Sequence, residues 1–167
     1  MPSSKSYPFE ALYHLSSALH QHNLDTHNIM QTILSHTGDI TGVTQGCLIT
    51  FHEDDSIRNA YVLDTEDAPE NTSELWETLI EQGLIGFVYH AHRTVTISNI
   101  TTDPRWPQLP NNPVMPQQGS AIGLPLYNGG DVFGVMLFMH KELDFFGDER
   151  IVVLEEIARL SGPALNN

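Results

Sequence analysis

The chain has 167 residues, a size that suits one domain with a hydrophobic core of its own. Seven lysines and arginines stand against twenty-one aspartates and glutamates, so the formal net charge is −14 and a nucleic-acid backbone or an anionic membrane surface would repel the protein. No apolar run approaches the roughly 20 residues of a membrane helix, and the single cysteine excludes an internal disulfide, so we expect a cytoplasmic protein.

Two helices and a hairpin are predicted in the first part of the chain, after about eight flexible residues. Apolar side chains three or four apart predict a helix from about residue 8 to 22, with one stripe made of Phe9, Leu12, Tyr13, Ser16 and Leu19. Asp25 is the expected N-cap of a second helix that ends just before Gly38. The buried side of that helix is expected to hold Ile29, Met30, Ile33 and Leu34. β-branched and apolar residues then predict strands over 46–51 and 61–63, joined by a polar turn over 53–56.

The middle of the chain predicts an acidic loop, a short helix and a strand. The loop covers residues 64–71, and Ser73 is the expected cap of a helix that stops at Gly83. That helix is expected to pack inward through Leu75, Trp76, Leu79 and Ile80. Residues 83–88 then lead into a strand over 94–100, with Val95 and Ile97 on one side of it.

Prolines recur every third residue between 101 and 119, at positions 104, 107, 110, 113 and 116. Three is the repeat of the polyproline II helix, so this spacing predicts an extended, stiff lid. A surface loop whose period is accidental explains the pattern equally well, and a proline ligand for a partner domain is a third interpretation.

The strongest pattern lies between residues 120 and 161. Apolar strands over 120–127 and 131–139 flank Asn128-Gly129, which can take the positive backbone angles of a two-residue hairpin turn. A helix over 147–161 repeats apolar residues at helical spacing and needs one face of that sheet to cover. Gly162-Pro163 is expected to interrupt this helix.

The order of these elements resembles that of a GAF domain over residues 9–166, so we treat 9–167 as one domain. The most characteristic pieces are Gly83 to Gly86, Asp103-Pro104-Arg105-Trp106, Ser120 with Pro125-Leu126, and Gly134-Val135. The resemblance implies an α+β fold with a central antiparallel sheet of five or six strands. The N- and C-terminal helices would cover one face, and loops with a short helix would cover a small-molecule pocket on the other.

The resemblance also implies a ligand-binding set. The segment from Asp103 to Trp106 is physically a turn in which the aspartate accepts a backbone hydrogen bond. In the family it lies at the mouth of the cavity, so Trp106 would stack on a planar ligand and Arg105 would bind an anionic group. Ser120 would point its hydroxyl into the cavity or bind a neighbouring backbone group. The expected set is completed by Phe87, Ile122 and Phe138.

Known GAF cofactors and reactions find little support in these residues. Cys47 alternates with apolar residues and is expected to be buried, and bilin-binding GAF domains attach their pigment through a cysteine commonly followed by histidine, whereas Leu48 follows here. GAF-type free methionine sulfoxide reductases work through several cysteines. Cyclic-nucleotide binders show an Asn-Lys pair that is absent, and only one residue separates Phe146 from Asp148-Glu149, whose acids suit the start of a helix. His20 and His22, or His90 and His92, would diverge on a helix, and on a strand His90 and His92 would share a face but lack a third ligand nearby. We therefore expect no metal site, no covalent bilin and no enzyme.

The expected function is therefore a sensory domain of a bacterial-type signalling protein, such as a two-component system. It would bind an unidentified small molecule and act through its terminal helices on an output domain or a homodimer. One alternative is a ligand-free dimerisation module whose cavity is filled by Phe87, Met136, Phe138 and Met139. The other alternative, a small-molecule redox enzyme, rests on Cys47 alone.

Overall fold

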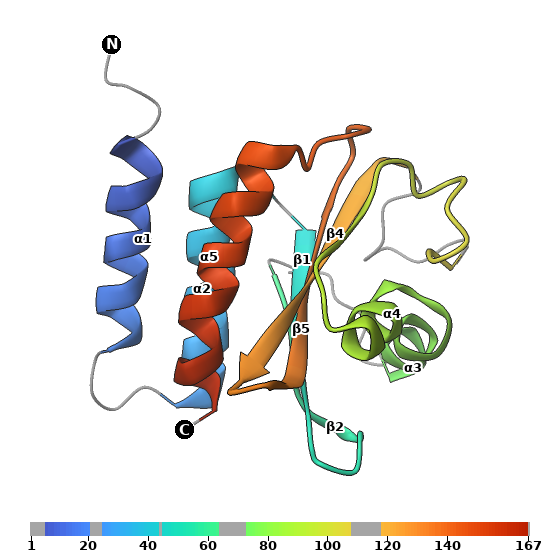
Figure 1. Cartoon of the computed structure of the whole chain (residues 1–167), viewed down its shortest axis with the longest axis horizontal. Coiled ribbons are helices and arrows are strands. Elements are labelled where there is room, and N and C mark those ends of the chain that lie inside the picture. Colours follow the sequence, from blue (N-terminus) through green and yellow to red (C-terminus); the bar gives the residue numbers. More distant parts are fainter. Residues whose placement is uncertain (1–5, 21–24, 44, 64–72, 108–117, 167) are drawn as a thin grey trace.

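A five-stranded antiparallel sheet lies between two groups of helices in this computed structural model, which describes residues 6–20, 25–43, 45–63, 73–107 and 118–166 (Figure 1). The inner face of the sheet is covered by α2 (Thr26–Thr41) and α5 (Asp148–Leu165), and α1 (Ser6–Leu19) packs on both of them. The outer face is covered by α3 (Ser73–Gln82) and α4 (Leu84–Ala91). This arrangement confirms the expected α+β fold. Within the described residues no helix is long and apolar enough to cross a membrane.

The strand order is β2-β1-β5-β4-β3, and every neighbouring pair is antiparallel. The strands are β1 (Gln45–Phe51), β2 (Ile57–Val62), β3 (Val95–Ile97), β4 (Ser120–Asn128) and β5 (Asp131–His140). Both expected hairpins are confirmed. The second turns one residue later than expected, because Asn128 pairs with Asp131 and the turn is centred on Gly129 and Gly130. Of these turn residues only Gly129 has a positive φ, 63°.

Alternate residues of the central strands supply two separate hydrophobic cores, as the two-residue period of a buried strand requires. The outer core of β1 and β5 consists of Cys47, Ile49, Phe51, Val135, Leu137 and Met139. The inner core, which packs on the helices, takes Leu48, Ile122, Leu124, Leu126, Met136 and Phe138 from the three central strands. The sheet is therefore buried on both faces.

The first two helices correct two expectations. Leu15 and Leu19 form the buried side of α1, whereas Phe9 and Tyr13 of the expected stripe are 74% and 70% exposed. Asp25 caps α2 as expected by accepting a hydrogen bond from the Asn28 backbone N–H at 2.8 Å. The helix runs past Gly38 to Thr41 and ends at Gly42, whose φ is 84°. The buried contacts of α2 with the sheet and α5 outweigh the roughly 1 kcal/mol that an internal glycine costs.

Two further helix boundaries differ from the sequence prediction. Residues 84–91 form α4 instead of simply leading into a strand, and the strand itself is limited to Val95–Ile97. Gly123 of β4 permits this close packing, because a Cβ there would lie 2.6 Å from a methyl carbon of Val88 on α4. α5 continues through Gly162 and Pro163 to Leu165, where Asn166 N–H still donates to the Gly162 carbonyl. Proline removes one helical hydrogen bond in the last turn but does not end the helix here.

Some sequence predictions lie outside the described residues. These are the acidic loop at 64–71, most of the proline-rich lid at 108–117, and the side chains of Leu75 and Trp76. α1 begins at Ser6, within the first eight residues that we expected to be flexible.

Candidate functional site

The seven expected ligand-binding residues do not form one cluster. Phe87 lies on α4 and Trp106 belongs to the outer core, and Asp103 and Arg105 are in the same turn as Trp106. Ile122 and Phe138 are fully buried in the inner core, on the opposite face of the sheet. Their exclusion from an outer-face pocket follows from strand parity, because successive side chains point to opposite faces. Ser120 is buried at the start of β4.

The four side chains expected to fill a collapsed cavity are likewise divided between the two faces. Met136 and Phe138 pack in the inner core, Met139 packs in the outer core, and Phe87 is 37% exposed. These residues therefore do not fill a common space.

The turn at Asp103 is confirmed in detail. Its carboxylate accepts the Arg105 backbone N–H at 2.9 Å, and its carbonyl accepts the Trp106 N–H at 3.1 Å. The Arg105 guanidinium donates to both carboxylate oxygens and, through Nη2, to the Thr96 carbonyl at 3.3 Å. Hydrogen bonds from Arg105 hold the pKa of Asp103 below its ordinary value. Trp106 is only 4% exposed, so the turn fixes the indole in the core beside α4.

Phe87 provides an accessible aromatic surface next to this turn. The guanidinium carbons of Arg93 and Arg105 lie 5.7 and 5.5 Å from the centroid of its ring. Both distances are within the range of a cation–π interaction. Two of the seven cationic side chains of an acidic protein therefore gather around one half-exposed ring.

Ser120 binds backbone groups, which was one of its two expected roles. Its hydroxyl donates to the Glu142 carbonyl at 2.7 Å and accepts the Phe145 N–H at 3.2 Å. Two nearby backbone bonds join the same segments: Ile100 N–H donates to the Gly119 carbonyl, and Asp144 N–H donates to the Ser98 carbonyl. We call these three segments, 98–100, 119–120 and 142–145, the Ser120 junction. The junction connects residues 98–100, which follow β3, and residues 119–120, where β4 begins, to the segment that enters α5.

The entry to α5 contains a stack that sequence reasoning missed. The rings of His140 and Phe145 are parallel, with centroids 3.6 Å apart, and the Arg150 guanidinium carbon lies 3.9 Å from the Phe145 centroid. His140 Nδ1 accepts the Glu142 backbone N–H at 3.1 Å, so this nitrogen carries no proton in the folded geometry. Burial lowers the pKa of His140, and Arg150 and Lys141 act in the same direction against Glu142. An aromatic pair directly before a helix start was the available signal for a packed entry.

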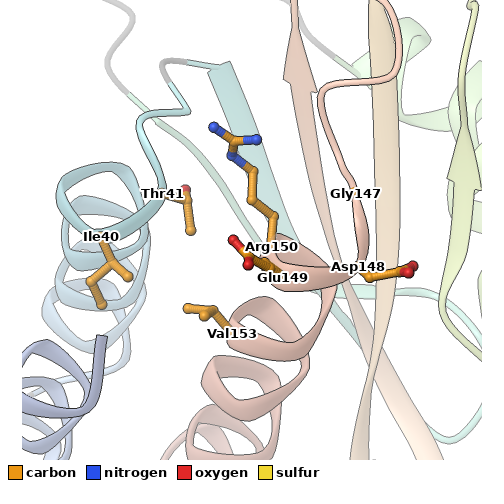
Figure 2. Close-up of a pocket in the computed structure, with 7 residues that line it drawn as sticks. All are labelled: Ile40, Thr41, Gly147, Asp148, Glu149, Arg150 and Val153. Carbon is orange, nitrogen blue, oxygen red and sulfur yellow. The ribbon is translucent and has the colours of Figure 1, made fainter. Parts of the chain in front are cut away.

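A pocket of about 410 Å³ adjoins this stack, between the last turn of α2 and the first turn of α5 (Figure 2). Figure 2 shows Ile40 and Thr41 on α2 facing Glu149, Arg150 and Val153 on α5, with Asp148 pointing away. Arg150 Nη1 donates to the Phe145 carbonyl at 3.0 Å, which joins the pocket wall to the junction. The two helices are therefore separated by open space at the end where the junction meets α5.

Cys47 is buried in the outer core, as expected. Burial raises the pKa of its thiol to about 12, so the sulfur stays protonated at neutral pH. No group of three His, Cys, Asp or Glu side chains in the described parts of the chain could hold a metal ion.

Three solved structures share this fold over almost the whole chain. The GAF domain of the Acinetobacter phosphoenolpyruvate-protein phosphotransferase has a TM-score of 0.71 and 14% identity, covering 99% of this chain and 95% of that one. The free methionine-R-sulfoxide reductase of Neisseria meningitidis, in complex with its substrate, has a TM-score of 0.75 and 16% identity, covering 99% and 92%. The A. aeolicus nlh2 GAF domain in an inactive state has a TM-score of 0.73 and 15% identity, covering 98% of both chains.

The reductase corrects our expectation that the chain is not an enzyme. That expectation drew on a fold family that we took to be mostly sensory, whereas the N. meningitidis protein is an enzyme with this same fold. The fold is therefore compatible with catalysis as well as with regulation. No curated protein sequence matches the chain. A family model described as GAF domain matches residues 23–166, and the chain thus belongs to the GAF domain family.

Proposed function

We propose that this chain is a regulatory GAF domain of a signalling protein. It binds a small molecule at the helix layer that covers the outer face of the sheet and passes the bound state to the layer formed by α1, α2 and α5. Two precedents support this reading: the N. meningitidis protein was solved with its substrate bound, and the nlh2 domain in a state described as inactive.

The ligand surface of this proposal is centred on Phe87. A half-exposed ring next to two guanidiniums suits a planar molecule that carries an anionic group. Arg105 is held in place by its ion pair with Asp103, so its guanidinium keeps a fixed position beside the Phe87 ring. Arg93 supplies the second guanidinium next to that ring.

The Ser120 junction is the observation that carries the proposal. The buried hydroxyl of Ser120, at the start of β4, links that strand through two hydrogen bonds to the segment 142–145 that enters α5. A ligand shifts an equilibrium only by its difference in affinity between two forms, so the linked element must differ between them. A displacement of residues 119–120 would move Phe145 and with it Arg150 at the open end between α2 and α5.

The partner in this proposal is a second copy of the chain. Phe9 and Tyr13 lie one helical turn apart on α1 and expose most of their surface, and Val152 on α5 is 68% exposed. Aromatic side chains exposed together on an outermost helix favour an isologous helix-to-helix interface.

Native mass spectrometry of the protein purified from its own host tests the proposal. We expect a retained small-molecule mass that is lost in Phe87→Ala and kept in Ile57→Ala, a control at an equally exposed position on an edge strand. In Ser120→Ala we expect the mass to remain, while the monomer–dimer distribution no longer differs between loaded and dialysed protein. Absence of any retained mass, or its persistence in Phe87→Ala, would contradict the proposed ligand surface.

A further inference from the structure

A second, larger pocket of about 620 Å³ lies at the opposite end of the sheet from the Ser120 junction, where β1 turns into β2 and β4 turns into β5 (Figure 1). Four segments far apart in the sequence line it: the β1–β2 turn, the end of α4, the β4–β5 turn and Asn166 after α5. Its volume is within the range of small-molecule sites. We call it the end pocket.

An aromatic wall and a fixed carboxylate define one side of the end pocket. The rings of Phe51 and Tyr89 are parallel, with centroids 4.4 Å apart. The Tyr89 hydroxyl donates to Asp55 Oδ1 at 2.6 Å, across 34 positions of sequence. Burial and the Asp55 carboxylate raise the pKa of Tyr89 to about 12, so the phenol stays a donor. A second tyrosine bond, from the Tyr127 hydroxyl to the His92 carbonyl at 2.6 Å, ties the end of α4 to β4.

The charged groups of the end pocket favour a cation. Glu53, Asp55 and Asp131 line it with three carboxylates, and among the described residues Arg58 adds one guanidinium. The imidazole rings of His52, His90 and His92 also line the pocket. The net charge of −14 raises the local concentration of cations around the protein. Since no three such side chains in the described part of the chain converge as metal ligands do, the acceptors are spread over the cavity.

We propose that the end pocket binds a small organic cation with an ammonium group at each end, of the linear aliphatic diamine class. One ammonium is bonded by Asp55 on the β1–β2 turn, beside the aromatic wall, and the other by Asp131 on the β4–β5 turn. The methylene stem lies against the apolar part of the lining, which Phe51, Tyr89 and Phe133 supply. This site is independent of the ligand surface at Phe87. Asn166 places the end of α5 in contact with the occupant.

Isothermal titration calorimetry of the full chain with putrescine tests the inference, with butane-1,4-diol as the uncharged analogue. We expect saturable binding of one putrescine per chain and none of the diol. Asp55→Asn and Asp131→Asn should each weaken binding about tenfold to a hundredfold, because each removes the negative charge that pairs with an ammonium group. Asparagine tolerates the left-handed backbone of Asp55, whose φ is 70°, so the first variant keeps the turn.

Asp39→Asn is the matched control, since it removes one exposed carboxylate from α2, away from the end pocket. We expect it to leave putrescine affinity within about twofold of the parent. Far-ultraviolet circular dichroism and thermal melts verify that all three variants fold. Non-saturable binding, or an equal loss in Asp39→Asn, would mean only diffuse attraction to an acidic protein and would overturn the inference. Neither result bears on the native-mass test at Phe87.

Discussion

Replacing Ser120 by alanine should destabilise the domain far more than the same change at a matched serine. Ser120 is 1% exposed, and its hydroxyl satisfies both the buried Phe145 N–H and the Glu142 carbonyl. An unsatisfied buried donor costs about 1–3 kcal/mol, and a lost neutral hydrogen bond to the carbonyl about 1 kcal/mol more. The expected loss is therefore about 2–4 kcal/mol, a large share of a typical 5–15 kcal/mol of unfolding free energy.

Ser161→Ala is the matched control for this experiment. Ser161 is fully buried in α5 and donates to the Ile157 carbonyl at 2.7 Å, but that carbonyl lies within the helix and no backbone donor depends on the hydroxyl. The control should lose less than about 1 kcal/mol. Urea unfolding followed by circular dichroism gives both values, and the melting temperature of Ser120→Ala should fall by roughly 5–15 °C. Equal losses in the two variants would refute the view that the junction is a structural link between the sheet and α5.

Further predictions concern His140 next to the junction, the two glycines Gly119 and Gly129, and Cys47 in the outer core. Because burial lowers the folded-state pKa of His140, folding favours its neutral form. The stabilisation present above the ordinary histidine pKa should therefore be lost as pH falls. The free energy of unfolding measured in urea should decline from about pH 7 to 5, and this decline should be smaller in His140→Phe. Gly119→Ala should prevent folding or reduce stability by more than about 3 kcal/mol, since φ is +126° and a Cβ would lie 1.9 Å from the His140 carbonyl oxygen. Gly129→Ala should cost only about 1 kcal/mol in the same urea unfolding, because φ is +63° but a Cβ there would meet no non-neighbouring atom within 4 Å. Cys47, with its thiol pKa near 12, should resist iodoacetamide at pH 8 in the native protein and react fully in urea, as read by mass spectrometry; rapid native labelling would contradict its burial.

Elements marked by a turn or a helix cap could be predicted from the sequence. The β4–β5 hairpin was predicted from two apolar strands around a glycine-rich turn. The start of α2 was predicted from Asp25, a favourable N-cap residue. α4 could not be assigned, because the continuous apolar run over residues 84–89 fits a buried strand as well as a helix. The end of α2 was missed because Gly38 and Gly42 carry the same signal, and only packing decides between them.

In the candidate site, contacts between residues close in sequence could be predicted, whereas contacts between distant residues could not. The turn from Asp103 to Trp106 was readable because its hydrogen bonds join residues two and three positions apart. The bond between Ser120 and Phe145 joins residues 25 apart, which no local pattern reveals. The face on which Ile122 lies was misjudged because a strand's alternation shows two faces without saying which one a helix layer covers.

The division of the interior by the sheet means that the two faces can diverge separately. Substitutions among Ile49, Leu137 and Val88 change only the compartment next to α4, while Leu48, Met136 and Ile157 lie in the other one. Among the described residues, no side chain is shared between these two cores. A lineage of such domains can therefore change the side chains packed on one face of the sheet while those on the other face persist unchanged.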